Sequence, residues 1–332
     1  MVVLAKGELE QIALPAAEPP PADVRSVDLS APSGPAREAA ARALVAACEE
    51  HGFFRVTGHG VPAELVRAAE AAAVGFFARP QGEKDAEAPT LGYGSKRIGG
   101  NGDLGWVEYL LLGVTPAGAA VPAAASASSS TLPDLLDEYT VAVRRMACAV
   151  LELMAEGLGI AAGAGDGGAL TRLVTRADSD CMLRVNHYPP RPPALSPCSL
   201  TGFGEHTDPQ IISVLRANGT SGLEIALPRD GAWASVPPDG DAFFVNVGDT
   251  LQVLTNGRFR SVRHRVVVNS EKSRVSMVFF GGPPPGERLA PLPQLLGDGG
   301  RSRYRDFTWS EFKNSGCRTR LAEDRLSRFE NK

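Results

Sequence analysis

Hydrophobic positions in the first half of this 332-residue chain recur every three to four residues in three places. These stretches are 36–50, 62–77 and 132–157. Such spacing gathers the apolar side chains on one face of a helix, so it predicts three amphipathic helices. Two shorter segments, 24–30 and 52–56, are expected to be strands because their apolar residues alternate or cluster over only a few positions.

From Met182 onward the pattern changes to short apolar runs separated by Gly, Pro and Asn. Strands are expected at 182–188, 202–206, 211–215, 223–227, 233–236, 242–247, 261–268 and 274–280. Eight short strands with such turns fit an antiparallel double-sheet jelly roll, also called a double-stranded β-helix. A further helix is expected to begin at Trp309. The predicted fold is therefore mainly β, with a jelly-roll core and flanking helices.

The pattern shows no clear linker between independent domains. We expect a mostly helical N-terminal region (1–180) packed on the jelly-roll core (181–285), followed by a C-terminal helical segment (286–332). Together they should form one integrated unit. Low-complexity stretches at 116–130 and 161–168 are expected to be surface loops.

Composition narrows the class of protein. The formal charge is −4 and no basic stripe appears, which argues against nucleic acid or acidic membranes as main partners. No apolar run is long enough to cross a membrane, and the N-terminus lacks the pattern of a secretory signal. The five cysteines are scattered without a Cys-x-x-Cys motif, which is typical of reduced thiols in a cytoplasmic protein.

One histidine–aspartate pair carries the most specific chemistry. His206 and Asp208 are two residues apart in a predicted strand, so both side chains point to the same face. His264, in a later strand of the same barrel, could complete a set of two histidines and one carboxylate. That set leaves three neighbouring coordination positions open and is characteristic of non-haem Fe(II) oxygenases. The remaining histidines are expected to be structural: His51, His59 and His187.

A second group could hold a dicarboxylate. Arg274 and Ser276 share one face of a predicted strand, and a guanidinium can hold a carboxylate through two parallel hydrogen bonds. Tyr188, with Asn186 two residues before it, could complete the site. An ordinary polar strand face is the alternative interpretation. Beside the histidine–aspartate set, the group favours oxidation that uses Fe(II), 2-oxoglutarate and dioxygen.

These motifs resemble those of the plant 2-oxoglutarate/Fe(II) dioxygenases of specialised and hormone metabolism. The motifs are His206-x-Asp208, His264, Asn186-x-Tyr188-Pro189 and Arg274-x-Ser276, and the resemblance covers nearly the whole chain. They do not separate flavonoid, ethylene-forming and gibberellin enzymes. Residues 203–223 and 245–259 are similar to gibberellin 2-oxidases, and residues 92–99 and 105–111 to the branch that acts on nineteen-carbon gibberellins.

The resemblance implies 2β-hydroxylation of bioactive gibberellins and their precursors, which inactivates the hormone. Ascorbate would serve as a reductant in vitro. A rigid, mostly apolar acid calls for an apolar pocket with one cation. The expected walls are Ile98, Trp106, Tyr109 and Phe243. The expected carboxylate partners are Arg97 and Lys313, although a lone cation is usually solvated and a Trp or Tyr is often part of a core.

Two alternatives stay open at this point. The first is another plant 2-oxoglutarate dioxygenase, such as a gibberellin 3-oxidase or a flavonoid oxidase. The second is a non-catalytic jelly roll that binds a hormone without oxidising it. Both a monomer and a homo-oligomer are compatible with the sequence.

Overall fold

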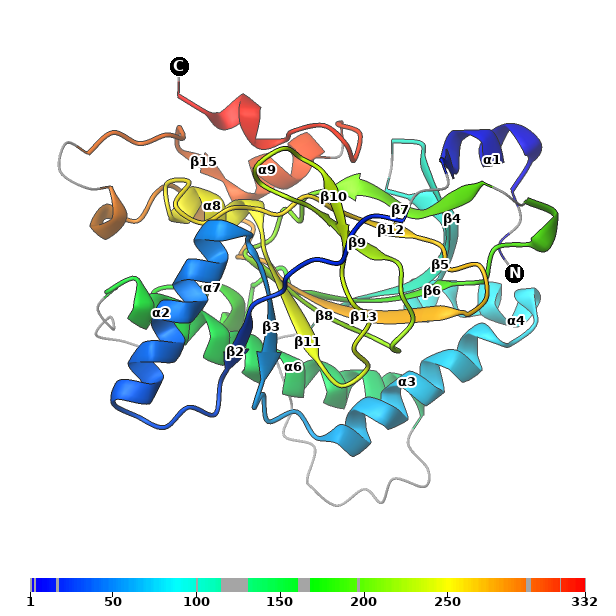
Figure 1. The fold of residues 1–332 in the computed structure, drawn as a ribbon, viewed down its shortest axis with the longest axis horizontal. Helices are drawn as coiled ribbons and strands as arrows, with labels where there is room; N and C mark the ends of the chain where they lie inside the picture. Colours follow the sequence, from blue (N-terminus) through cyan, green and yellow to red (C-terminus); the bar gives the residue numbers. More distant parts are fainter. Residues whose placement is uncertain are drawn as a thin grey trace.

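The computed structural model describes residues 2, 4–15, 18–99, 101–114, 131–160, 168–195, 198–296, 300–316 and 318–331. The expected loop at 116–130 lies outside these ranges, as do most of the loop at 161–168 and Cys317. Within the described ranges, two sheets face each other and helices pack on the outer side of the larger one (Figure 1).

The larger sheet contains strands from both halves of the chain. Across the sheet they are β2 (Ser26–Asp28), β3 (Phe53–Thr57), β11 (Phe243–Val247), β8 (Ile212–Ala217), β13 (Arg274–Gly281), β6 (Met182–Tyr188), β5 (Asp103–Gly113) and β4 (Gly94–Ile98). Among the described strand pairs of this sheet, only β2 and β3 run parallel. The N-terminal region therefore adds β2 and β3 to one edge of the jelly-roll sheet and β5 and β4 to the other.

The smaller sheet faces the larger one. Its strands, in order, are β1 (Ala13–Leu14), β7 (Ser199–His206), β12 (His264–Val267), β9 (Leu223–Ala226) and β10 (Trp233–Ser235). Each strand expected after Met182 is present in one of the two sheets, which confirms the jelly roll. β5 and β7 approach each other closely on one side of the barrel, where Gly105 faces Gly202. A Cβ on Gly105 would overlap the carbonyl oxygen of Gly202, so this approach requires glycine.

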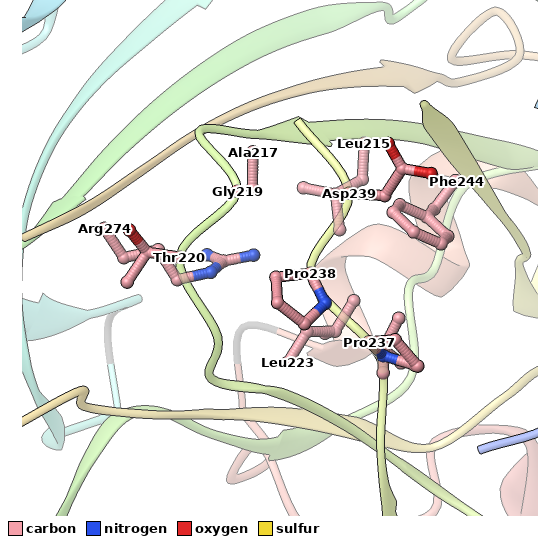
Figure 2. Close-up of a pocket in the computed structure, with 11 residues that line it drawn as sticks. Leu215, Ala217, Gly219, Thr220, Leu223, Pro237, Pro238, Asp239, Phe244 and Arg274 are labelled. Carbon is pink, nitrogen blue, oxygen red and sulfur yellow. The ribbon is translucent and has the colours of Figure 1, made fainter. Parts of the chain in front are cut away.

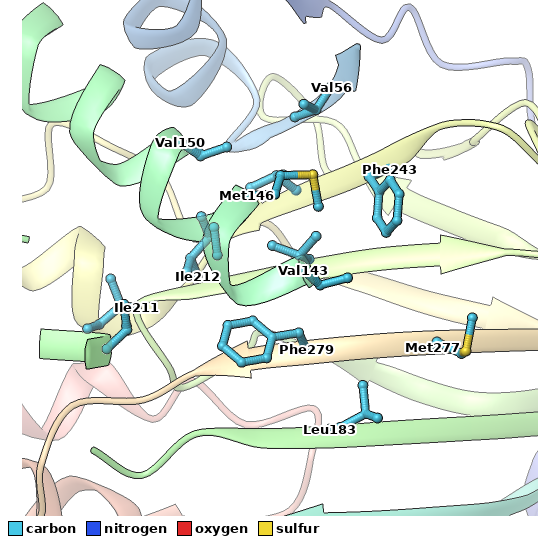
Figure 3. Close-up of a cluster of buried hydrophobic side chains, with 14 of the residues drawn as sticks. Val56, Val143, Met146, Val150, Leu183, Ile211, Ile212, Phe243, Met277 and Phe279 are labelled. Carbon is cyan, nitrogen blue, oxygen red and sulfur yellow. The ribbon is translucent and has the colours of Figure 1, made fainter. Parts of the chain in front are cut away.

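Three helices cover the larger sheet, as the periodicity predicted. They are α2 (Pro35–Glu50), α3 (Ala63–Phe77) and α6 (Leu132–Gly157). Helix α6 begins with a capping box between Thr131 and Asp134. Figure 3 shows Val143 and Met146 of α6 against the side of the sheet that carries Ile212, Phe243 and Phe279, and all five residues belong to one apolar cluster. This cluster holds the larger sheet from its outer side.

The remaining elements surround this core. They are α1 (Lys6–Ile12), α4 (Gln81–Ala86), α5 (Ala88–Leu91), α7 (Arg172–Thr175), α8 (Asp249–Leu254), α9 (Trp309–Gly316), β14 (Arg288–Leu289), β15 (Phe307–Thr308) and the 3-10 turns η1 (Pro193–Leu195), η2 (Pro293–Leu295) and η3 (Leu326–Phe329). The helix expected to begin at Trp309 is α9. Among the described residues, no helix has the length and apolarity needed to span a bilayer.

Alternation along the central strands separates two apolar clusters. Val185 of β6 and Met277 of β13 belong to the cluster beneath the helices. Tyr188 and Val278, on the same strands, belong to a second cluster between the two sheets. Because successive strand residues face opposite sides, the residues that share a face with Tyr188 and Val278 line the interior of the barrel. The candidate active site is built on this interior face.

Candidate active site

Three potential metal ligands converge between the two sheets. His206 ends β7, Asp208 follows it, and His264 begins β12, directly opposite His206 in the strand register. One ligand atom from each residue lies within 4.8 Å of the others, and among the described residues this is the sole group of its kind. The Nε2 atoms of His206 and His264 lie 3.6 and 3.8 Å from Oδ1 of Asp208.

Backbone carbonyls orient the two imidazoles. Nδ1 of His206 donates to the carbonyl oxygen of Gly204 at 2.8 Å, and Nδ1 of His264 donates to that of Val262 at 3.2 Å. A carbonyl can only accept, so the proton of each neutral ring is on Nδ1. The lone pair of each Nε2 therefore faces Asp208, where a metal would bind.

The electrostatics of the three residues favour a metal cation. Burial alone would raise the pKa of Asp208, but the neighbouring His264 and His206 hold it well below its usual range. Asn246 donates to Oδ2 of Asp208 at 3.0 Å, so Oδ1 is left facing the histidines. Burial, together with His206, lowers the pKa of His264 to about 4, although Asp208 opposes this shift. A carboxylate and neutral imidazoles are the forms that bind a metal.

A buried arginine lies on the interior face of β13. Arg274 pairs with Tyr188 across β13 and β6, and Ser276 pairs with Asn186. Burial lowers the pKa of Arg274. Its Nε and Nη1 have no hydrogen-bond partner among the described residues. Figure 2 shows its side chain reaching into a small cavity beside Thr220. A buried guanidinium with free N–H groups suits a carboxylate ligand.

Two family profiles match the chain. Residues 179–283 match the 2OG-Fe(II) oxygenase superfamily, and residues 24–129 match the non-haem dioxygenase in morphine synthesis N-terminal family. The chain is 50% identical to gibberellin 2-beta-dioxygenase 1 of Pisum sativum over 307 residues, covering 92% of this chain and 90% of that protein. It is 51% identical to gibberellin 2-beta-dioxygenase 1 of Arabidopsis thaliana, covering 87% and 89%. The chain belongs to the gibberellin 2-beta-dioxygenase family.

Solved structures agree with this family fold. A structure described as JOX2 in complex with 2OG, Fe, and JA aligns with a TM-score of 0.78 at 27% identity, over 100% of this chain and 95% of that chain. A structure of dioxygenase for auxin oxidation (DAO) in rice aligns with a TM-score of 0.76 at 25% identity, over 93% and 100%. Together with the ligand cluster, the comparisons establish an Fe(II)/2-oxoglutarate oxygenase.

The structure divides the expected substrate walls into two groups. Ile98 belongs to the apolar cluster between the sheets. Tyr109 shares a face with Val107 of that cluster and contacts the guanidinium of Arg184. Trp106 instead packs outside the barrel with the N-terminal segment and donates to the carbonyl of Pro189 at 3.1 Å. Trp106 directly precedes Val107 on β5, and successive strand residues face opposite sides of the sheet, so Trp106 points away from the barrel interior.

Phe243, Arg97 and Lys313 also lie away from the barrel interior. Phe243 stacks on Tyr139 of α6, beneath the sheet, and its neighbour Phe244 faces the interior instead. Arg97 is exposed on β4. Lys313 is half exposed on α9 and forms an ion pair with Asp180 at 2.6 Å. We therefore correct these three expectations, because strand phase or an existing partner turns each side chain elsewhere.

The sequence reasoning missed Arg184. This residue shares the interior face of β6 with Asn186 and Tyr188, and the pattern Arg-x-Asn-x-Tyr could have indicated it. It also missed Phe203 of β7, whose ring lies 4.5 Å from that of His206. Phe203 lies beside the ligand cluster, and Arg184 contacts the Phe203 ring.

The outer face of β6 carries a buried polar network. Glu108 of β5 accepts hydrogen bonds from Lys84 at 2.6 Å and from Tyr93 at 2.7 Å. His187 lies 2.7 Å from the same carboxylate through Nδ1 and 2.6 Å from the Ser273 hydroxyl through Nε2. These contacts agree with the structural role expected of His187. The network joins the residue before Arg274 to the helices beneath the sheet.

Proposed function

We propose that this chain inactivates bioactive gibberellins and their precursors by 2-oxoglutarate-dependent 2β-hydroxylation. The observation that carries the proposal is the His206, Asp208 and His264 cluster, in a chain half identical to gibberellin 2-beta-dioxygenases over most of its length. The segments 92–99 and 105–111 further support nineteen-carbon gibberellins as the preferred substrates.

In this proposal His206, Asp208 and His264 would hold Fe(II). His206 and His264 present Nε2, and Asp208 presents Oδ1 while Asn246 holds its other oxygen. With 2-oxoglutarate and dioxygen, the bound iron supplies the oxidation of an unactivated carbon–hydrogen bond. A set of three such ligands would leave coordination positions for 2-oxoglutarate and dioxygen.

Arg274 would orient 2-oxoglutarate by binding its far carboxylate. Ser276 and Tyr188 lie beside it on the same interior face, and Asn186 is the cross-strand partner of Ser276. Apolar neighbours such as Leu223 and Phe244 line the cavity that receives the Arg274 side chain. They would keep water from competing with the carboxylate for the guanidinium.

We further propose that the three regions act as one catalytic unit in the cytoplasm. Strands β2–β5 belong to the same sheet as β6, β8, β11 and β13, which supports a single unit. The described cysteines are all free thiols, which supports a reducing compartment. Gibberellin and dioxygen would be the partners of the reaction, and ascorbate would keep the iron reduced in vitro.

Product analysis tests the proposed function. Purified protein is incubated with a nineteen-carbon gibberellin, Fe(II), ascorbate and 2-oxoglutarate, and the position of the new hydroxyl is found by mass spectrometry against standards. We expect the 2β-alcohol. A 3-hydroxylated product would favour a gibberellin 3-oxidase, turnover of a flavonoid alone would favour a flavonoid oxidase, and binding without oxidation would favour a hormone-binding protein.

A further inference from the structure

Arg184 is a second arginine on the interior face of the barrel. It pairs with Val278 across β6 and β13, four residues along β6 from Tyr188, the partner of Arg274. Four strand residues span about 13 Å, so the two arginines start from well-separated points on one face. The carboxylate held at Arg274 would leave Arg184 available for a different anion.

Two aromatic rings and one amide hold the Arg184 side chain. Its guanidinium carbon lies 3.9 Å from the ring centroid of Tyr109 and 5.1 Å from that of Phe203. Its Nε donates to Oδ1 of Asn186 at 2.7 Å. Because Nε is engaged and the plane is held against aromatic rings, the two terminal nitrogens are fixed in orientation.

Those terminal nitrogens have no anionic partner. Nη2 of Arg184 is buried and has no hydrogen-bond acceptor, and no carboxylate of the described residues forms an ion pair with the guanidinium. The buried Arg216, by contrast, is paired with Glu70. Among the described arginines, burial lowers the pKa of only Arg184 and Arg274. A guanidinium whose terminal nitrogen is buried without an acceptor is unfavourable, which indicates that an anionic ligand completes the site.

The position of Arg184 relates this anion to the metal ligands. The ring of Phe203, which contacts the guanidinium, lies 4.5 Å from the ring of His206. One aromatic side chain therefore separates the cation from a ligand of the proposed iron. An acid bound at Arg184 would lie with its apolar part along Phe203 and Tyr109, facing the metal cluster.

We propose that Arg184 binds the carboxylate of the substrate, in the place that the sequence assigned to Arg97 or Lys313. This inference rests on the proposed function for the identity of the acid. A rigid ring system with its carboxylate held at Arg184 can rotate little, so the arginine determines which carbon faces the iron. Arg184 is then a specificity-determining residue, separate from the 2-oxoglutarate anchor Arg274.

The test compares a gibberellin with its methyl ester, which has the same rings without the charge. In Arg184→Gln, kcat/KM for the acid should fall roughly 10- to 150-fold, the loss of one charge-assisted contact, while kcat/KM for the ester changes little. Arg184→Lys should recover part of the acid preference. The KM for 2-oxoglutarate should stay near its wild-type value. Arg67→Gln, an exposed change on α3, is the matched control and should keep the wild-type ratio.

Two kinetic results for Arg184→Gln would overturn the proposal. The acid-to-ester ratio could be unchanged, whether or not overall activity falls, or the main effect could be on 2-oxoglutarate. Loss of the acid preference in Arg97→Gln, with Arg184→Gln unaffected, would return the anchor to the residue that the sequence indicated.

Equilibrium dialysis keeps the anchor and the activity distinguishable. Binding of the acid is measured without dioxygen, in the presence of Fe(II) and 2-oxoglutarate, for each variant with a wild-type melting temperature. Binding that depends on Arg184 without turnover would support the anchor and refute the proposed function. Turnover with binding that does not depend on Arg184 would support the proposed function and refute the anchor. A wild-type chain that does not bind the acid would also refute the anchor.

Discussion

His206 and His264 are cross-strand partners on β7 and β12, and their ring centroids lie 4.2 Å apart. These residues are 58 positions apart in the sequence and meet because both strands belong to the smaller sheet. The Asp208 carboxylate lies beside both rings. The geometry of the metal cluster is thus a property of strand pairing, and it can be tested without disturbing that pairing.

Replacing Asp208 should remove the metal and the activity while leaving the fold. Asp208→Ala deletes the only carboxylate of the cluster, so Fe(II) affinity should fall sharply and succinate formation should stop. Iron content after dialysis, together with circular dichroism, measures both parts. Wild-type turnover by a folded Asp208→Ala protein would contradict the assignment of the ligands.

Asn246 should raise the affinity for Fe(II) through its hydrogen bond to Asp208, without binding the metal itself. Its amide holds Oδ2 of Asp208 at 3.0 Å, so Asn246→Ala frees the carboxylate to rotate. Loss of such a supporting contact lowers metal affinity or activity about 10- to 100-fold. Titration of activity with Fe(II) should show a higher requirement for iron with much of the maximal rate retained. An unchanged iron requirement would mean that Asn246 does not support Asp208.

Arg274→Gln should weaken 2-oxoglutarate far more than gibberellin. A charge-assisted contact contributes about 1.5–3 kcal/mol, so KM for 2-oxoglutarate should rise roughly 10- to 150-fold. Steady-state kinetics with each substrate varied in turn measures the difference, and the exposed Arg172→Gln serves as the control. Equal effects on both substrates would count against the anchoring role.

The Glu108 network should make stability depend on acid pH. Burial would raise the pKa of Glu108, but hydrogen bonds from His187, Lys84 and Tyr93 lower it to about 2 from an ordinary 4.5. A lowered folded-state pKa stabilises the protein above the unfolded value, and this contribution is lost as pH falls from about 4.5 toward 2. Urea unfolding of wild type should weaken over that window. Glu108→Gln should show a smaller decline there.

Breaking the ion pair between Glu108 and Lys84 should lower the free energy of unfolding at neutral pH. Glu108→Ala leaves the fully buried Lys84 without its carboxylate, which typically costs about 3–5 kcal/mol. The double variant Glu108→Leu with Lys84→Met removes both charges and should recover much of that loss. Unfolding free energies from urea titrations decide the comparison. A single variant as stable as wild type would show that the pair is not a significant determinant of stability.

Strand and helix patterns predicted most of the core. The expected strand 182–188 is β6, and the expected helix 132–157 is α6, because each has a regular period. Strands β4 and β5 were not predicted. β5 has Trp106, Glu108 and Leu110 buried on one face and Val107 buried on the other. With both faces covered, the strand lacks the alternation of apolar and polar residues that marks a half-buried strand.

The candidate site was partly predictable because regular spacing along a strand places residues on a common face. Same-face spacing indicated Arg274 with Ser276, since both lie on β13 and strand geometry fixes this relation locally. It also indicated His206 with Asp208, although β7 ends at His206 and Asp208 lies just beyond the strand. Phe243 and Trp106 were expected in the barrel interior, but each lies on the other face of its strand. Sequence alone does not tell which face of a strand points inward when both faces are apolar. Arg184 was missed because its unpaired state depends on residues from β5, β6 and β7 together.

The most direct test of the central claim is the ratio of two products in one reaction. Succinate and 2β-hydroxylated gibberellin are quantified together by mass spectrometry for wild type and Asp208→Ala. We predict equal amounts in wild type, neither product without 2-oxoglutarate, and neither in Asp208→Ala. Hydroxylated gibberellin formed without 2-oxoglutarate, or succinate formed with no oxidised gibberellin, would contradict the account.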